Sequence, residues 1–330
     1  MRRLLLFLLF PLLLALGYCL VAGSWLLLTP VAPSQPVFVD IQPGSTLQQI
    51  AQDLQRRSVI RSALVLKLLA RWQGQGSRIH AGRYQFTAAS TPAAILQRLL
   101  EGDVEKASLT IPEGFSLEQI IARIDSSGYG DKETLRQWAY DPAFIAEMGI
   151  SATSLEGYLF PETYLFAPGS GEKQLLRMMV NELSRQLDKK LLQQAKQLNL
   201  NRHQLITLAS IIEKETAKSE EMPLISGVFH NRLARNMRLQ TDPTVIYGIE
   251  DFDGNLTRKQ LNTLTPYNTY LQPGLPPGPI ASPGLQALQA AARPAATDYL
   301  YFVARGDGSH HFSRTLKEHN AAVRKFQLRR

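Results

Sequence analysis

Glu213 stands directly after an almost wholly apolar stretch, residues 205–212. A helix that is apolar on all sides should be buried, so Glu213 is expected where this helix leaves the interior. Desolvation disfavours the charged carboxylate and should raise its pKa, as a general acid near neutral pH requires. Glu215 lies about 200° further around the helix, so the two carboxyls should not share one pocket wall. The pattern is equally compatible with a helix-end Glu213 that pairs with a nearby Lys or Arg.

Polar side chains that suit a sugar gather just beyond this helix. Asn231 and Arg232 are followed by Gln240, Thr241 and Asp242. Amide and hydroxyl groups of this kind can hydrogen-bond a sugar hydroxyl or an acetamido group. The simpler alternative is that Asp242 opens a turn with the proline that follows and that Arg232 is an ion-pair partner.

Other chemistries find little support. His310, His311 and His319 are not spaced like a metal-binding trio, and no G-x-S-x-G nucleophile turn occurs. Cys19 is the only cysteine, which excludes an intramolecular disulfide and a cysteine-based metal site. The sequence therefore predicts neither a metal nor a cofactor.

Several long motifs, taken in order, resemble those of the endolytic murein transglycosylases, the YceG-like (MltG) family. Agreement of many ordered motifs is far more specific than one short pattern, and here it covers essentially the whole chain. The motifs are residues 155–164 (LEGYLFPETY), 209–216 (ASIIEKET), 229–233 (FHNRL), 239–248 (LQTDPTVIYG), 266–270 (PYNTY), 274–280 (GLPPGPI), 311–313 (HFS) and 318–320 (EHN).

The resemblance implies an endolytic peptidoglycan lytic transglycosylase, a lyase acting on a polysaccharide. Such an enzyme cleaves the β-1,4 bond between N-acetylmuramic acid and N-acetylglucosamine in nascent glycan strands. It forms 1,6-anhydro-N-acetylmuramyl ends and so limits strand elongation. The resemblance also implies Glu213 as the catalytic residue and peptidoglycan synthases (penicillin-binding proteins) as partners. Candidates for holding the sugars are Glu162, Asn231, Gln240, Thr241, Tyr247, Tyr267 and Asn268.

Two other functions stay open at this point. One is a wall-binding scaffold for peptidoglycan synthases, in which Glu213 is merely structural. The other is a hydrolytic muramidase, which would need a second carboxylate beside Glu213, such as Glu162 or Asp242.

The pattern of elements predicts an α+β protein. A small α/β subdomain, residues 37–107, resembles a LysM module at its start (PGSTL, residues 43–47), and a larger mixed α+β catalytic domain covers residues 108–330. Leucines at core spacing predict one long amphipathic helix over residues 172–198. The glutamate motif is expected on a helix that begins after Asn201 and continues to about Lys218.

The N-terminal segment predicts a membrane anchor. Residues 4–28 are almost unbroken apolar residues without a charge, enough to cross about 30 Å of hydrocarbon. Arg2 and Arg3 precede this run, which favours a cytoplasmic tail over residues 1–3 and an exported remainder after a linker, residues 29–36. A cleaved signal peptide is the alternative. The expected location is the inner membrane, with the catalytic part in the periplasm.

The charge of the chain suits an anionic partner. Its formal net charge is +8, which is compatible with a wall polymer or a membrane surface. No dense cluster of Lys and Arg with interleaved aromatic residues occurs, so a nucleic-acid partner is not expected.

Overall fold

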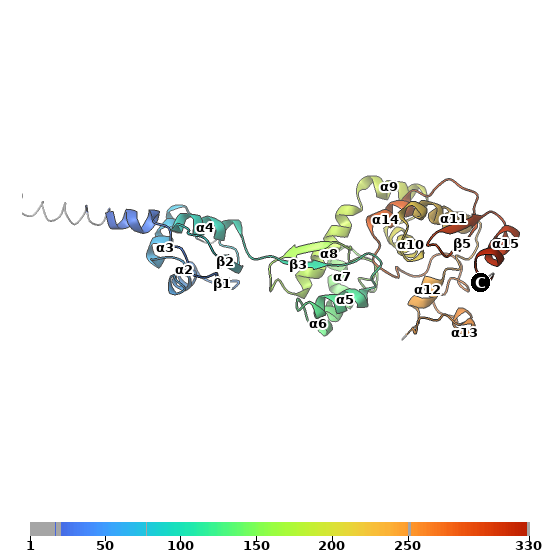
Figure 1. Ribbon diagram of the computed structural model, residues 1–330, viewed down its shortest axis with the longest axis horizontal. Helices are drawn as coiled ribbons and strands as arrows, with labels where there is room; N and C mark the ends of the chain where they lie inside the picture. The colour runs from blue at the N-terminus through green and yellow to red at the C-terminus, as the bar shows by residue number, and fades with distance from the viewer. Residues whose placement is uncertain (1–16, 18–20, 77, 250–251, 329–330) are drawn as a thin grey trace, which may run out of the picture. The chain divides into compact units, whose positions relative to one another are not determined.

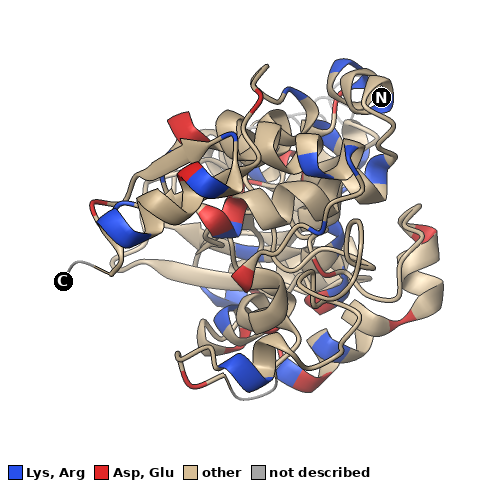
Figure 2. Ribbon diagram, turned by 90° about the vertical axis from the view of Figure 1, so that its right-hand side faces the viewer, with Lys and Arg blue, Asp and Glu red and all other residues tan. Residues whose placement is uncertain are grey.

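The structure is a computed structural model that describes residues 17, 21–76, 78–249 and 252–328. The chain divides into two compact units. One comprises residues 1–107 with 165–169, and the other comprises residues 108–164 with 170–330. Both helices and short strands occur throughout (Figure 1), so the α+β prediction is confirmed. Lys and Arg are interspersed with Asp and Glu along the ribbon (Figure 2).

The first unit is a two-stranded sheet covered by helices. Strands β1 (Val37–Ile41) and β2 (Gly82–Phe86) pair antiparallel, with Val39 opposite Tyr84. Alternation along β1 turns Val39 into the core. The helices α2 (Leu47–Arg56), α3 (Ala63–Trp72) and α4 (Pro92–Glu101) complete this core. The LysM-like assignment of this unit stays a prediction.

The second unit is mostly helical. Its early elements are most of β3 (Ala107–Thr110), α5 (Leu117–Ser126), α6 (Lys132–Tyr140), α7 (Pro142–Glu147), the start of β4 (Thr163–Phe166), α8 (Glu172–Gln186) and α9 (Lys189–Gln197). Its later elements are α10 (Arg202–Glu215), a short 3-10 helix (Ser219–Glu221), α11 (Met222–Ala234), α12 (Asp242–Tyr247), α13 (Arg258–Leu261), α14 (Leu285–Ala292), β5 (Tyr301–Ala304), β6 (His310–Ser313) and α15 (Leu316–Phe326). The strands form separate pairs, β3 with β4 and β5 with β6.

Helix α10 is the centre of the second unit. Asn201 caps it by accepting the backbone N–H of Gln204, and the Gln204 side chain accepts the N–H of Asn201 in return. Every residue from Leu205 to Ile212 is buried, and α10 packs against α14, α11 and α12. Figure 1 shows α14, α11 and α12 around α10. The predicted all-round burial of this helix is confirmed.

The prediction of one continuous helix over residues 172–198 is wrong. The chain leaves the helix at Leu187, where ψ is 65°, and α9 begins after Asp188. The Asp188 carboxylate accepts the backbone N–H of Leu191 at 2.7 Å, which caps a new helix. Because Leu187 and Leu191 are both buried, the hydrophobic spacing survives the break and conceals it in the sequence.

The predicted anchor, residues 4–28, lies mostly outside the described residues. Residues 21–28 are described and are helical. Across the described parts of the chain, none of the helices combines the length and apolarity needed to span a bilayer.

Candidate active site

The last turn of α10 carries two glutamates that face different surroundings. Glu213 and Glu215 are both partly buried, and the helix ends at Glu215 because Thr216 is extended. Their contacts differ completely, as the angle between them predicts.

Glu213 lies against two loops. Its carboxylate accepts the backbone N–H of Gly284 at 2.9 Å, and Lys214 beside it donates to the carbonyl of Gly114 at 3.1 Å. Burial raises the pKa of Glu213, the Gly284 hydrogen bond opposes this shift, and the charge of Glu113 adds to it. The predicted raised pKa is therefore confirmed in direction, and the carboxyl has a backbone donor rather than a Lys or Arg as its hydrogen-bond partner.

Glu215 is a second carboxyl with a raised pKa. Burial raises the pKa of Glu215 to about 7; the Thr241 hydrogen bond and the charge of Arg232 oppose this shift, and the charge of Asp242 adds to it. The Thr241 hydroxyl donates this hydrogen bond to the carboxylate. A carboxyl that titrates near neutral pH can both give and accept a proton under physiological conditions.

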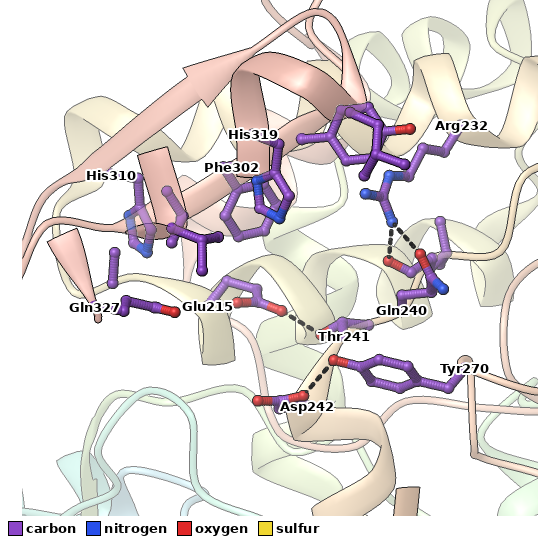
Figure 3. A pocket seen from close by; sticks show the side chains of 16 residues that line it. Glu215, Arg232, Gln240, Thr241, Asp242, Tyr270, Phe302, His310, His319 and Gln327 are labelled. Carbon is purple, nitrogen blue, oxygen red and sulfur yellow. Dashed lines mark hydrogen bonds between the residues drawn. The ribbon is translucent and has the colours of Figure 1, made fainter. Parts of the chain in front are cut away.

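A cavity of about 420 Å³ opens in front of Glu215. Figure 3 shows Glu215 and Thr241 joined by a hydrogen bond, with Asp242 and Tyr270 beside them. Tyr270 donates its hydroxyl proton to Asp242 at 2.6 Å. The remaining walls come from elements far apart in the sequence and include Arg232, Leu239, Gln240, Tyr301, Phe302, His310, Leu316, His319, Val323 and Gln327.

Arg232 holds two of these walls together. Its buried guanidinium donates to the carbonyl of Leu300 at 2.6 Å and to that of Leu239 at 2.8 Å. It also lies over the ring of Tyr301, 5.1 Å from the ring centre. The guanidinium therefore joins the 238–240 turn to the β5–β6 hairpin and places a positive charge behind the cavity. The alternative reading of Arg232 as a simple ion-pair partner is not supported, because carbonyl oxygens take its hydrogen bonds.

Two histidines complete the hairpin side of the cavity. His310 contacts the Glu221 carboxylate through Nδ1 at 2.7 Å. His319 stacks on Tyr301 with 5.2 Å between ring centres, and its buried Nδ1 has no hydrogen-bond partner among the described residues. Burial and the charge of Arg232 lower the pKa of His319, so this ring is neutral.

The predicted substrate-binding residues fall into three groups. Gln240 and Thr241 line the cavity beside Glu215. Tyr247 and Tyr267 pack together, 4.7 Å between ring centres, and Tyr247 donates to the carboxylate of Glu156 at 3.2 Å.

The third group consists of side chains whose polar atoms are bound within the protein. The Asn231 amide donates to the carbonyls of Thr297 and Tyr299. Asn268 is fully buried, and its amide donates to two backbone carbonyls. The exposed Glu162 carboxylate accepts the N–H of its neighbour Thr163. These contacts give all three residues a structural role, and their binding of substrate stays a prediction.

Glu156 is a buried acid that the sequence analysis did not single out. Both of its carboxylate oxygens accept the backbone N–H of Leu117, at 3.1 Å each, at the start of α5. Burial raises its pKa to about 7, and the hydrogen bonds from Leu117 and Tyr247 oppose that shift. Its neighbours in the sequence, Leu155 and Gly157, gave no sign that Glu156 is a buried acid.

Within the described residues, no three or more His, Cys, Asp or Glu side chains come together in a group that could hold a metal ion.

The chain is similar to a known protein family and to individual members of it. A model of the YceG-like family matches residues 39–325. An endolytic murein transglycosylase of Bacillus subtilis is 34% identical, over 93% of this chain and 91% of that protein. One from Streptococcus pneumoniae serotype 2 is 30% identical over 87% of this chain, which spans 58% of that longer protein. A crystal structure of a YceG-like protein from Listeria monocytogenes aligns with a TM-score of 0.61 at 34% identity, covering 88% of this chain and 99% of that one.

Proposed function

Because the chain belongs to the YceG-like family, we propose that it is an endolytic peptidoglycan lytic transglycosylase, a lyase that cuts the glycan strand at N-acetylmuramic acid. Two relatives that carry the name endolytic murein transglycosylase match it over most of its length. One observation supports acid–base chemistry in this chain: a carboxyl whose pKa is raised to about 7 lines a cavity together with Gln240 and Thr241.

That carboxyl is Glu215, which we propose as a second candidate for the acid and base beside Glu213, the glutamate that the motif predicts and whose pKa burial also raises. Gln240 and Thr241, both expected to hold sugars, lie at Glu215, and Thr241 donates directly to its carboxylate. Glu213 instead accepts a backbone N–H from a loop. Glu213 stays the prediction from the motif, and it competes directly with Glu215 in the experiment below.

The reaction needs only one such group. Protonated Glu215 gives its proton to the glycosidic oxygen as the bond from that oxygen to the anomeric carbon of the muramyl residue breaks. The 6-hydroxyl of the same muramyl residue then forms a bond to that carbon, and its proton passes to the Glu215 carboxylate. No water is consumed, and the acid is regenerated. Attack from within the sugar has a large proximity advantage. The Thr241 hydroxyl stabilises the carboxylate between the two proton transfers.

One observation favours hydrolysis as a second candidate. Asp242 lines the same cavity as Glu215, and a glycosidase uses a second carboxylate to activate water or attack the sugar. A hydrogen bond from the Tyr270 hydroxyl fixes the position of this side chain beside Glu215. The two reactions differ in product, since hydrolysis leaves a reducing end.

We further propose the cellular setting that the sequence predicts. Residues 4–28 would anchor the chain in the inner membrane with the catalytic unit outside, where it meets nascent strands and the synthases that make them. Tethering at the membrane would raise its effective concentration near those strands.

The test is mass analysis of fragments that the purified full-length chain releases from uncrosslinked glycan strands. We expect 1,6-anhydromuramyl ends from the native protein. Loss of these ends in Glu213→Gln with activity in Glu215→Gln would assign the acid to Glu213, and the reverse result would assign it to Glu215. Reducing ends that disappear in Asp242→Asn would establish a hydrolase that uses Asp242. If the native protein binds strands and releases no fragments, the chain acts as a wall-binding scaffold.

A further inference from the structure

Helix α3 of the first unit has a stripe of large apolar side chains that nothing in that unit covers. Leu64, Leu68 and Trp72 are spaced four residues apart and are 60%, 56% and 83% exposed. Residues at this spacing lie on one side of a helix. The opposite side, which includes Leu66, packs into the core of the unit, so burial in the unit does not explain the stripe.

Positive charge borders the same stripe. Lys67 and Arg71 lie on α3 beside it, α3 contains no acidic residue, and Arg61 stands just before the helix. Among the described residues, no ion pair joins any of these three cations to a carboxylate. An apolar side with Trp and Leu next to unpaired Lys and Arg is the composition of a helix that lies in a membrane interface.

The start of α3 is tied to the end of the apolar N-terminal segment. Arg61 donates to the carbonyl of Thr29 at 3.0 Å, and its guanidinium lies 4.5 Å from the ring centre of Trp25. Residues 21–28 are helical, and Val21 and Leu28 are highly exposed. The apolar stripe therefore begins beside the point where the apolar segment ends, and one lipid surface can receive both.

We propose that the Leu64–Leu68–Trp72 side of α3 docks on the surface of an anionic phospholipid bilayer. The apolar side chains enter the boundary between headgroups and acyl chains, and Lys67 and Arg71 extend their charged ends to lipid phosphates. A second copy of this chain fits less well, because two such faces would bring their unpaired cations together. The contact would hold the first unit flat against the membrane, whatever reaction the second unit performs.

Spin labels in the full-length chain test this contact. With Cys19 replaced by serine, a label is attached at Leu68→Cys or, as a control, at Leu264→Cys, which replaces another highly exposed leucine. The chains are reconstituted in vesicles of phosphatidylethanolamine and phosphatidylglycerol. We expect the label at position 68 to collide more with oxygen and less with a water-soluble nickel complex than the label at 264.

The arms of the experiment separate the possible partners. Arg71→Gln should lower the ratio of embedded to aqueous label at position 68 about fivefold in these vesicles, the effect of one basic residue near an anionic surface, and should change little in phosphatidylcholine. A label at 68 that stays as aqueous as the label at 264 overturns the proposal. A label at 68 that is shielded from both oxygen and nickel overturns it in favour of a protein partner.

Discussion

Replacing Glu215 with Gln should stabilise the second unit at alkaline pH and do little at acid pH. The pKa of Glu215 rises from an ordinary 4.5 to about 7 on folding, so the folded state holds this proton more tightly than the unfolded state. Folding is therefore favoured while the carboxyl is protonated in both states, and stability falls as pH rises from 4.5 to 7. Gln carries no such cost, and its side-chain oxygen can still accept the Thr241 hydroxyl.

The size of the effect follows from the two pKa values. A difference of about 2.5 pH units corresponds to about 3 kcal/mol, an upper value for the gain in the free energy of unfolding at pH 8. At pH 4 the gain should be close to zero. A gain in stability on loss of a candidate acid is the expected exchange between stability and activity.

Urea unfolding at pH 4 and pH 8, followed by the fluorescence of Trp138 in the second unit, measures this difference. Glu118→Gln is the matched control, because its hydrogen bond from Arg136 lowers the pKa of Glu118. That variant should lose stability at pH 8 rather than gain it. Equal changes in Glu215→Gln at both pH values would refute the reasoning that Glu215 is desolvated in the cavity.

Three further substitutions separate structural from binding roles. Gly157→Ala should lower the free energy of urea unfolding by about 1–3 kcal/mol more than Gly274→Ala, because of overpacking. Both glycines have positive φ, but only at Gly157 would an added methyl group meet Pro279, at 2.3 Å. Asn231→Ala should cost about 1–3 kcal/mol of stability from two unmatched carbonyls and leave the KM for glycan unchanged, whereas a rise in KM alone would make Asn231 a binding residue. If His319 donates a hydrogen bond to the substrate, His319→Leu should lower kcat/KM roughly tenfold, which corresponds to the loss of that one bond. The urea midpoint should not change, because Nδ1 of His319 has no partner among the described residues. A lower midpoint with full activity would contradict a substrate-binding role.

Local patterns in the sequence predicted the helix that carries the two glutamates. Asn201 and the apolar run after it are enough to place α10, because capping and burial act within one helix. The break at Leu187 was missed since the leucines keep their spacing across it, and only the capping carboxylate of Asp188 marks the new start. Strand β4 was not anticipated, because it is four residues long and depends on a partner elsewhere in the chain.

The site was predictable only as far as one helix determines it. Periodicity correctly predicted a raised pKa for Glu213 and a different direction for Glu215. It did not reveal that Glu215 is the carboxyl at the cavity, because the residues that desolvate Glu215 come from the 239–242 turn, Tyr270 and the β5–β6 hairpin. The burial of Arg232 escaped notice for the same reason, since its partners Leu239 and Leu300 lie on two different segments.

The wall that α15 contributes to the cavity has a consequence for the order in which the enzyme matures. Leu316, His319 and Val323 belong to the final tenth of the chain, while Glu215 and Thr241 are made long before them. A ribosome-bound chain that already contains Glu215 and Thr241 still lacks the side of the cavity that α15 provides. Residues that are made about 100 positions after Glu215 thus complete the cavity, so a growing chain can hold this carboxyl before the pocket around it exists.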